Sequence, residues 1–300
     1  MRKVLSSGER ATISLCDDAP APSIQSPRNL MIASLHATLE TLIRDGFLLV
    51  YNSEVLDIVE TARALQKAGI HNMEVTCRIR DSVGRLRRLK RELPDFKAGA
   101  ASLMDFPRTR KRLNARNGDP AKVLPGVSEM VEAGADYLVS AVCFRPESYA
   151  AYGGRLPMIP GCATPSEVLG QYELGANVCK LFPASLVGGV KWLDAVDPAI
   201  HRFIPIMPTG GTTCENIPDY VQSGTLLLGG SFSMIPKDVL KKIESEQDYD
   251  LLAEEFRKIK AIIDAARSRK YPGLDFKTAT LAQIEASTGR EFNTASHRLA

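Results

Sequence analysis

The sequence predicts a (β/α)8 barrel, in which short buried strands alternate with longer amphipathic helices. Between about residues 47 and 231, short apolar runs are separated by segments with helical spacing, which is the pattern of βα units around a parallel sheet. Several runs are apolar without alternation, as expected for strands covered on both faces. The 300 residues accommodate a barrel of roughly 250 residues as a single unit.

Eight runs in this region have the length and composition of strands. They cover residues 47–52, 72–77, 96–102, 137–142, 158–162, 177–182, 203–209 and 225–230. In this fold the active site lies at the carboxyl ends of the strands. Polar residues and glycines that end a run are therefore the first candidates for chemistry.

Helix signals separate these strands. After Ser53 and until Gly69, apolar residues recur at helical spacing, at Val55, Ile58, Val59, Ala62 and Leu65. This pattern predicts a helix that starts soon after Ser53. Thr164 and Glu167 form a capping-box pattern with proline at the first helical position, which predicts a helix directly after the fifth strand that ends at Gly175.

Three regions divide the chain. Residues 1–45 comprise an arm rich in Ser, Asp and Pro, which we expect to be mobile, and an amphipathic helix that we expect to close the bottom of the barrel. That helix carries apolar residues at Leu39, Leu42 and Ile43. The barrel occupies residues 46–269 and includes a helix over residues 249–267. Residues 270–300 form a C-terminal tail with few apolar residues, to which the pattern assigns no role.

The composition is that of an ordinary globular protein. The apolar fraction is 44%, the charged fraction is 24% and the net charge is +3, which excludes a disordered or fibrous chain and implies no nucleic-acid partner. Two basic runs, over residues 85–91 and 108–116, contain no interleaved aromatic residues. We interpret them as solvated faces in preference to a polyanion site.

Metal, disulfide and membrane signals are missing from the sequence. The six cysteines form no CxxC pair and the four histidines have no ligand spacing, so we expect reduced thiols, no metal and no cofactor. No run reaches the roughly 18 apolar residues of a transmembrane helix, and no apolar signal region follows the first residues. We therefore expect a cytoplasmic protein without a membrane partner.

Lys180 is the clearest candidate for chemistry, because it interrupts an apolar strand. It lies within Asn177-Val-Cys-Lys-Leu-Phe-Pro183, where an inward-facing side chain would enter a partly desolvated barrel mouth. Burial favours the uncharged amine, which is the form that attacks a ketone and forms an imine. The alternative is a lysine that extends along the outer face of the barrel into solvent.

Glu74, Thr76 and Arg78 share one parity on the second strand. A carboxylate in the barrel lumen suits proton transfer during carbinolamine formation. An arginine at the strand end suits a substrate carboxylate through bidentate hydrogen bonds. The alternative is an ion pair between Glu74 and Arg78 that only closes the barrel.

Glycine turns end the seventh and eighth strands, at Pro208-Thr-Gly-Gly211 and Gly229-Gly-Ser-Phe232. Glycine lets backbone N–H groups approach an anion, and this end of the fold often binds a phosphate. Two such turns on consecutive strands favour a phosphate site over ordinary tight turns.

At these residues the chain resembles the 2-keto-3-deoxy-6-phosphogluconate (KDPG) / 4-hydroxy-2-oxoglutarate (KHG) aldolase family, class I enzymes on a (β/α)8 barrel that are typically homotrimers. The resemblance covers about residues 47–267 and includes five motifs in family order. They are Glu74-Val-Thr-Cys-Arg78, Ile159-Pro-Gly-Cys-Ala-Thr-Pro-Ser-Glu167, Lys180-Leu-Phe-Pro-Ala184, Met207-Pro-Thr-Gly-Gly211 and Gly229-Gly-Ser231.

The resemblance implies a role for each matched residue. Lys180 forms the Schiff base, Glu74 shuttles protons and Arg78 holds the carboxylate of the keto acid. The phosphate is bound by Gly210, Gly211 and Ser231. Substrate binding is also implied for Ser102, Phe182, Thr209 and Gly230.

Two strand ends and one segment depart from the family pattern. The family's Gly-Ala-Gly-Thr reads Gly99-Ala-Ala-Ser102 here, so Ala101 adds a methyl group near the site. The family's Ser-Pro-Gly reads Ser140-Ala141-Val142, so a proline that shapes the pocket is absent. The segment 104–132 is longer than the family norm, and we expect it to form a lid or an extra loop over the barrel mouth.

The leading hypothesis is reversible cleavage of a 2-keto-3-deoxy-6-phospho sugar acid to pyruvate and a phosphorylated aldehyde, glyceraldehyde 3-phosphate. A second enzymatic hypothesis is cleavage of 4-hydroxy-2-oxoglutarate or another unphosphorylated keto acid. A non-catalytic barrel that binds a phosphorylated ligand is the alternative of another class, and a site without a convergent Lys180–Glu74 pair would favour it. The expected partners are the small 2-keto acid and further copies of the chain in a homotrimer.

Overall fold

The computed structural model describes residues 27–294, with side chains from residue 33 onward, so the arm expected over residues 1–26 lies outside the described residues. All eight predicted runs contain strands, and the run 158–162 is divided at Pro160 into two short ones. The strands are β1 Phe47–Tyr51, β2 Asn72–Thr76, β3 Lys97–Leu103, β4 Tyr137–Ser140, β5 Met158–Ile159, β6 Gly161–Cys162, β7 Cys179–Leu181, β8 Ile206–Pro208 and β9 Leu228–Ser231.

Helices connect the strands and precede and follow them. They are α1 Pro27–Asp45, α2 Ile58–Lys67, α3 Ser82–Glu92, α4 Pro107–Arg116, α5 Val127–Glu132, α6 Pro146–Tyr152, α7 Pro165–Glu173, α8 Val190–Val196, α9 Ile217–Gln222, α10 Lys237–Glu246, α11 Tyr249–Lys270 and α12 Leu281–Thr288. Four short helical turns are η1 Pro120–Lys122, η2 Ala184–Leu186, η3 Asp197–His201 and η4 Phe232–Met234. The capping box predicted at Thr164 and Glu167 is confirmed at the start of α7.

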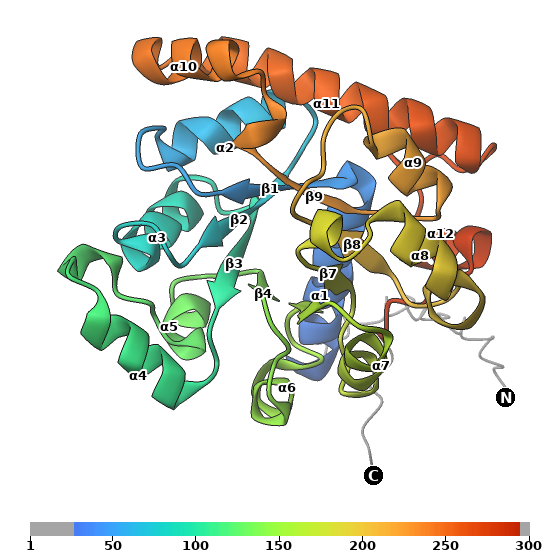
Figure 1. The fold of residues 1–300 in the computed structure, drawn as a ribbon, viewed down its shortest axis with the longest axis horizontal. Helices are drawn as coiled ribbons and strands as arrows, with labels where there is room; N and C mark the ends of the chain where they lie inside the picture. Colours follow the sequence, from blue (N-terminus) through green and yellow to red (C-terminus); the bar gives the residue numbers. More distant parts are fainter. Residues whose placement is uncertain (1–26, 295–300) are drawn as a thin grey trace, which may run out of the picture.

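All the strand pairs are parallel. One sheet has the order β5-β4-β3-β2-β1-β9 and the other has the order β6-β7-β8. An isolated parallel bridge joins Thr209, after β8, to Gly229 of β9. Figure 1 shows most of the helices around the outside of the strands, with α11 along one edge next to α2 and α9. The predicted α/β architecture with a parallel sheet is confirmed.

Side chains alternate along the strands between two hydrophobic cores. On β1, Phe47, Leu49 and Tyr51 pack in an outer core with the surrounding helices, whereas Leu48 belongs to an inner core. Other inner-core residues on the strands are Ala101, Tyr137, Val139, Ile159 and Met207, and Val178 joins them just before β7. Because successive side chains of a strand point to opposite faces, a residue that alternates with outer-core residues faces the inner core.

Helix α1 and the C-terminal segment complete the inner core. Leu39, Leu42 and Ile43 of α1 are fully buried there, and Figure 1 shows α1 in the middle of the molecule, behind the strands. The C-terminal segment buries four large apolar side chains in the same core, Phe276, Leu281, Ile284 and Phe292. The sequence pattern assigned no role to this part of the chain, but residues 271–294 belong to the packed fold.

Helix α2 starts later than the spacing predicted. The hydroxyl of Ser53 accepts a hydrogen bond from the N–H of Leu56 at 3.0 Å, and Val55 is 57% exposed. The N-cap is Asp57, whose side chain accepts hydrogen bonds from two amides of the first turn. The prediction of a start soon after Ser53 was wrong, because a local side-chain–backbone turn competes with the helix at these residues.

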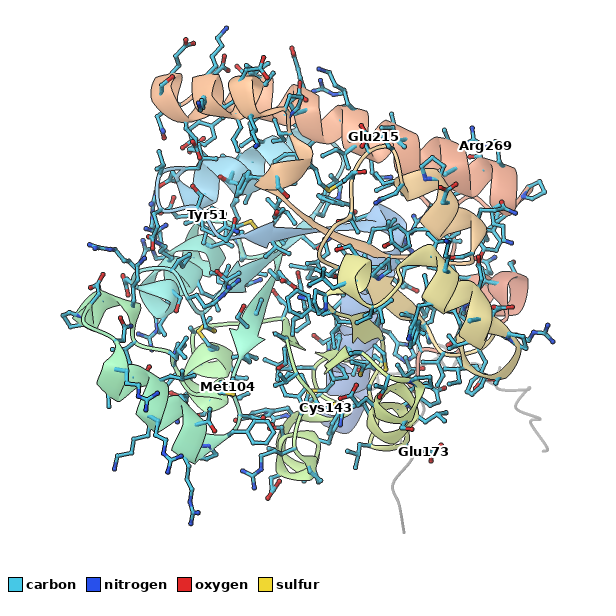
Figure 2. The ribbon with its side chains drawn as sticks, in the orientation of Figure 1. Tyr51, Met104, Cys143, Glu173, Glu215 and Arg269 are labelled. Atoms are coloured by element: carbon cyan, nitrogen blue, oxygen red, sulfur yellow. The ribbon has the colours of Figure 1, made fainter. Side chains whose placement is uncertain are left out.

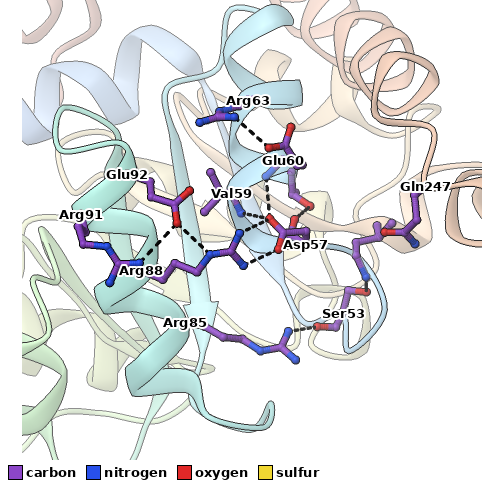
Figure 3. A network of polar contacts seen from close by, with 12 residues as sticks. Ser53, Asp57, Val59, Glu60, Arg63, Arg85, Arg88, Arg91, Glu92 and Gln247 are labelled. Carbon is purple, nitrogen blue, oxygen red and sulfur yellow. Dashed lines mark hydrogen bonds and ion pairs between the residues drawn. The ribbon is translucent and has the colours of Figure 1, made fainter.

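The first basic run lies on α3 and is paired with acidic neighbours. Arg88 donates hydrogen bonds to Asp57 and to Glu92, and Arg85 forms an ion pair with Glu54 at 3.2 Å. Figure 3 shows how Asp57 joins the start of α2 to α3. Burial opposes the charge on Asp57, but the hydrogen bonds from Arg88 and the helix amides outweigh it and hold the pKa of Asp57 below its usual value. These arginines thus stabilise the packing of α3 beside α2.

The segment 104–132 forms α4, η1 and α5, and α4 buries none of its residues. Two ion pairs join η1 and its N-cap to the loops that follow β1 and β2. They are Arg80–Asp119 at 2.9 Å and Lys122–Glu54 at 3.2 Å. The segment therefore contacts the rim at the carboxyl ends of these two strands.

Candidate active site

Lys180 faces the inside of the strands. Its neighbours Cys179 and Leu181 on β7 belong to the outer core, so the alternation turns Lys180 inward. The residue is 5% exposed, and its Nζ lies over the ring of Phe182, 5.4 Å from the centroid. The alternative of a lysine extended along the outer face is wrong.

Glu74 lies opposite Lys180 and contacts it directly. On β2, Met73 and Val75 belong to the outer core, so Glu74 is turned inward and is only 1% exposed. Lys180 Nζ donates a hydrogen bond to Glu74 Oε1 at 3.2 Å, between residues 106 positions apart in the sequence. The partner of Glu74 in this structure is Lys180, so the alternative ion pair with Arg78 is not formed.

Three buried polar atoms on this inner face have no hydrogen-bond partner among the described residues. They are Glu74 Oε2, Thr76 Oγ1 and Thr209 Oγ1. A buried polar atom without a partner is costly, so these atoms are available to a polar ligand or to water that enters the site. Thr76 was missing from the predicted site residues, although its parity with Glu74 is visible in the sequence.

Tyr137 and Asn72 form the polar floor below this pair. Asn72 and Tyr137 are fully buried, and the Tyr137 hydroxyl lies 3.4 Å from the Asn72 side-chain oxygen. A methyl group on Gly99, which pairs with Glu74, would overlap the Tyr137 ring. Burial, together with the nearby charge of Glu74, raises the pKa of Tyr137 well above its usual value. Tyr137 therefore stays neutral beside the carboxylate.

Arg78 and Ser102 lie at the carboxyl ends of β2 and β3. Arg78 is exposed and lines a cavity of about 220 Å³ with Leu113 and Asn114 of α4. Ser102 is partly buried and has a positive φ of 56°, a conformation that favours glycine. No hydrogen bond or ion pair within residues 27–294 joins either residue to Lys180 or Glu74.

The two glycine turns lie side by side. Gly210 and Gly211 have φ values of 85° and 86°, which require glycine, and the bridge between Thr209 and Gly229 places the turns next to each other. Within residues 27–294, neither Gly210 nor Gly211 donates its N–H to a backbone carbonyl. A methyl group on Gly210 would lie 3.4 Å from the Phe182 ring, so this turn packs against the residue that follows β7.

The other phosphate candidates contribute differently. Ser231 is partly buried, and its hydroxyl lies 2.8 Å from the hydroxyl of Ser233. A side chain on Gly230 would be directed at Met234 and Phe47, which belong to the outer core. Gly230 can therefore reach an inner ligand only through its backbone.

Figure 2 shows side chains filling the space between the strands and the surrounding helices. A cavity of about 560 Å³ lies elsewhere, lined by Arg44, Asp45 and His71 among others, and no predicted site residue lines it. Within residues 27–294, no three His, Cys, Asp or Glu side chains are close enough together to bind a metal ion. A membrane-spanning helix would need to be longer or more apolar than any helix described for this chain.

Comparisons with known proteins agree on one group of relatives. A family model described as KDPG and KHG aldolase matches residues 47–251. The KHG/KDPG aldolase of Escherichia coli strain K12 is 31% identical over 197 residues, which cover 65% of this chain and 81% of that protein. The 2-dehydro-3-deoxy-phosphogluconate aldolase of Dickeya dadantii is 31% identical over 192 residues, which cover 64% of this chain and 79% of that protein.

A solved structure of similar fold is the KDPG aldolase from Legionella pneumophila, captured with pyruvate as a covalent carbinolamine intermediate. It superposes with a TM-score of 0.59 at 24% sequence identity and covers 73% of this chain and 97% of its own. The residues matched by the family model, 47–251, include both Lys180 and Glu74.

Proposed function

Because this chain belongs to the KDPG and KHG aldolase family, and is thus an enzyme of the aldolase type of lyase, we propose that it cleaves a KDPG-type 2-keto acid through a Schiff base on Lys180. One observation carries the proposal. Lys180 Nζ lies 3.2 Å from Glu74 Oε1 and both side chains are buried. A buried amine beside a carboxylate supplies the nucleophile and the proton-transfer group that imine formation needs.

The proposed cycle begins when Lys180 passes a proton to Glu74. The free amine then adds to the C2 carbonyl, and a proton moves from nitrogen to oxygen to form a carbinolamine. Glu74 donates a proton to the hydroxyl, which leaves as water, and the nitrogen lone pair forms the protonated imine. The C3–C4 bond then breaks and its electron pair moves into the imine to give an enamine, while the C4 hydroxyl returns a proton to Glu74 and becomes the carbonyl of the aldehyde that leaves. Glu74 passes this proton to C3, and water hydrolyses the resulting imine, which releases pyruvate and regenerates Lys180.

We assign the two ends of the substrate to the two sides of the site. Arg78, with Ser102 on the next strand, would bind the carboxylate of the keto acid. The backbone of Gly210, Gly211 and Gly230, with the side chains of Thr209 and Ser231, would bind the phosphate. The positive φ values of Gly210 and Gly211 and the contact between the first turn and Phe182 support this assignment.

A second candidate substrate is 4-hydroxy-2-oxoglutarate. The name KHG/KDPG aldolase of the Escherichia coli relative covers both keto acids, and the imine chemistry is common to them. The two candidates differ in the group that the glycine turns would hold.

The proposal extends to architecture and assembly. We propose that the two sheets form one (β/α)8 barrel, because β5 and β6 are separated only by Pro160 and a bridge links β8 to β9. We further propose a homotrimer whose interfaces lie on the flank of the barrel, in the cytoplasm and without a nucleic-acid or membrane partner. These last assignments rest on the family resemblance and the composition alone.

The test is release of pyruvate from KDPG and from 4-hydroxy-2-oxoglutarate, measured with a coupled dehydrogenase. Wild type and the control Lys241→Ala, at an exposed lysine of α10, should release pyruvate, and Lys180→Ala should not. A higher kcat/KM for KDPG supports the leading substrate. A higher value for the unphosphorylated acid supports the second. Release from neither substrate contradicts the proposed function.

A further inference from the structure

Thr76 is a buried polar residue whose hydroxyl the fold does not use. It is 0% exposed and lies on the inner face of β2, because its neighbours Val75 and Cys77 belong to the outer core. Its Oγ1 has no hydrogen-bond partner among the described residues. The residue paired with it on β3 is Ala101, whose methyl group offers no polar atom.

A threonine is a poor choice for such a position if its role is only structural. An unpaired buried hydroxyl loses its hydrogen bonds to water and gains none in return, whereas a valine of the same shape avoids that loss. The hydroxyl of Thr76 therefore favours a partner that arrives with the ligand.

The position of Thr76 on the strand indicates which part of the ligand it meets. Strand residues two apart on one face are separated by about 6.6 Å, so Thr76 lies one such step from Glu74, and it is the last residue of β2 before the turn that carries Arg78. In the proposed function, C2 of the keto acid is bonded to Lys180 Nζ, which lies 3.2 Å from Glu74, and the carboxylate at C1 extends toward Arg78. The C1 end of the substrate then passes Thr76.

We propose that Thr76 is a further substrate-contacting residue, whose hydroxyl donates a hydrogen bond to the carboxylate of the bound 2-keto acid. The inference rests on the proposed Schiff-base function and adds a second contact for the carboxylate, deeper in the barrel than Arg78. The contact is common to phosphorylated and unphosphorylated keto acids, so it does not depend on which of them is the natural substrate.

The experiment compares Thr76→Val and Thr76→Ser with a matched control, Thr225→Val. Thr225 lies just before β9, is also 0% exposed and also has an unpartnered Oγ1, but it is remote in sequence from every predicted site residue on β2 and β7. Each protein is incubated with increasing pyruvate and borohydride, and the adduct on Lys180 is quantified by peptide mass spectrometry. Thermal unfolding is measured in parallel.

Thr76→Val should raise the half-saturating pyruvate concentration by about 10–100-fold, the effect of losing one hydrogen bond to a charged group. Thr76→Ser should restore most of the affinity, and Thr225→Val should leave it unchanged. Both valine variants should unfold at or above the wild-type temperature, because each removes an unpaired hydroxyl.

Each other outcome contradicts a specific claim. Wild-type saturation in Thr76→Val overturns the contact while leaving the Schiff-base function intact. A lower unfolding temperature in Thr76→Val without rescue by Thr76→Ser assigns Thr76 a structural role and also overturns it. Absence of any adduct on Lys180 in the wild type overturns the proposed function itself.

Discussion

Replacing Glu74 by glutamine removes the only charge that contacts Lys180 among the described residues while keeping the shape of the side chain. The two groups are 3.2 Å apart, with side-chain exposures of 6% for Lys180 and 1% for Glu74. Removing one partner of a buried ion pair costs about 3–5 kcal/mol. The glutamine oxygen still accepts a hydrogen bond from Nζ, so we expect a loss near the lower end of that range.

The effect on turnover should be larger than the effect on folding. Loss of a general acid–base slows a reaction by roughly 10²–10⁴-fold, so Glu74→Gln should lower kcat by that factor while slow trapping of pyruvate by borohydride persists. The assays are pyruvate release and urea unfolding.

The control is Glu255→Gln, which removes another largely buried carboxylate that pairs with a lysine, Lys258, on α11. This variant should retain turnover close to wild type. If Glu74→Gln also turns over at the wild-type rate, proton transfer by Glu74 is refuted.

Three further changes test other parts of the structure. Ser231→Asp should raise KM strongly for KDPG and much less for an unphosphorylated keto acid, because the added carboxylate repels the phosphate; equal harm to both would refute the phosphate site. Asp45, through a hydrogen bond that outweighs burial, raises the pKa of His71 above 6.5. The free energy of unfolding that His71 adds relative to His71→Gln should therefore be fully present below about pH 6.5, and it should be lost as the pH rises through the raised pKa. Urea unfolding of both proteins at several pH values measures this difference, and a difference that grows with pH contradicts the prediction. Ile284→Ala should lower the free energy of unfolding by about 2–5 kcal/mol, because Ile284 is 0% exposed. Its control, Leu186→Ala at a side chain 82% exposed, should change little, and equal effects would show that the C-terminal segment does not stabilise the fold.

The strands were predictable because a strand that is buried on both faces appears in the sequence as a short, nearly continuous apolar run. The apolar run 47–52 is the strand β1, and the lysine that interrupts the run 177–182 lies in β7. The sequence placed Glu74 and Lys180 on strands as candidates for the interior, but it left open an outward-facing Lys180, which the burial of its side chain in the structure excludes. The capping box at Thr164 was predictable for a different reason, since its two hydrogen bonds are local.

The remaining features depend on contacts between distant segments. The hydrogen bond between Lys180 and Glu74 joins residues 106 positions apart, so its distance could not be read from either motif. Helix α2 begins after Asp57 because the Ser53 hydroxyl accepts the N–H of Leu56 in a turn, and because Arg88 of α3 donates a hydrogen bond to Asp57. The missing hydrogen bond of Thr76 is also visible only when all its neighbours are in place.

The C-terminal segment was underestimated because its apolar residues are few and widely spaced. Phe276, Leu281 and Phe292 do not form a periodic pattern, yet all three are buried in the inner core with α1. Low apolar content therefore did not indicate a free tail, since a few large side chains were enough to fix it to the fold.

The most direct test of the central claim is to identify the lysine that forms the imine. The full-length protein is treated with pyruvate and borohydride, digested, and analysed by peptide mass spectrometry. We predict one reduced adduct, on Lys180, and its loss together with all turnover in Lys180→Ala. An adduct on a different lysine, or full activity in Lys180→Ala, would contradict the Schiff-base assignment.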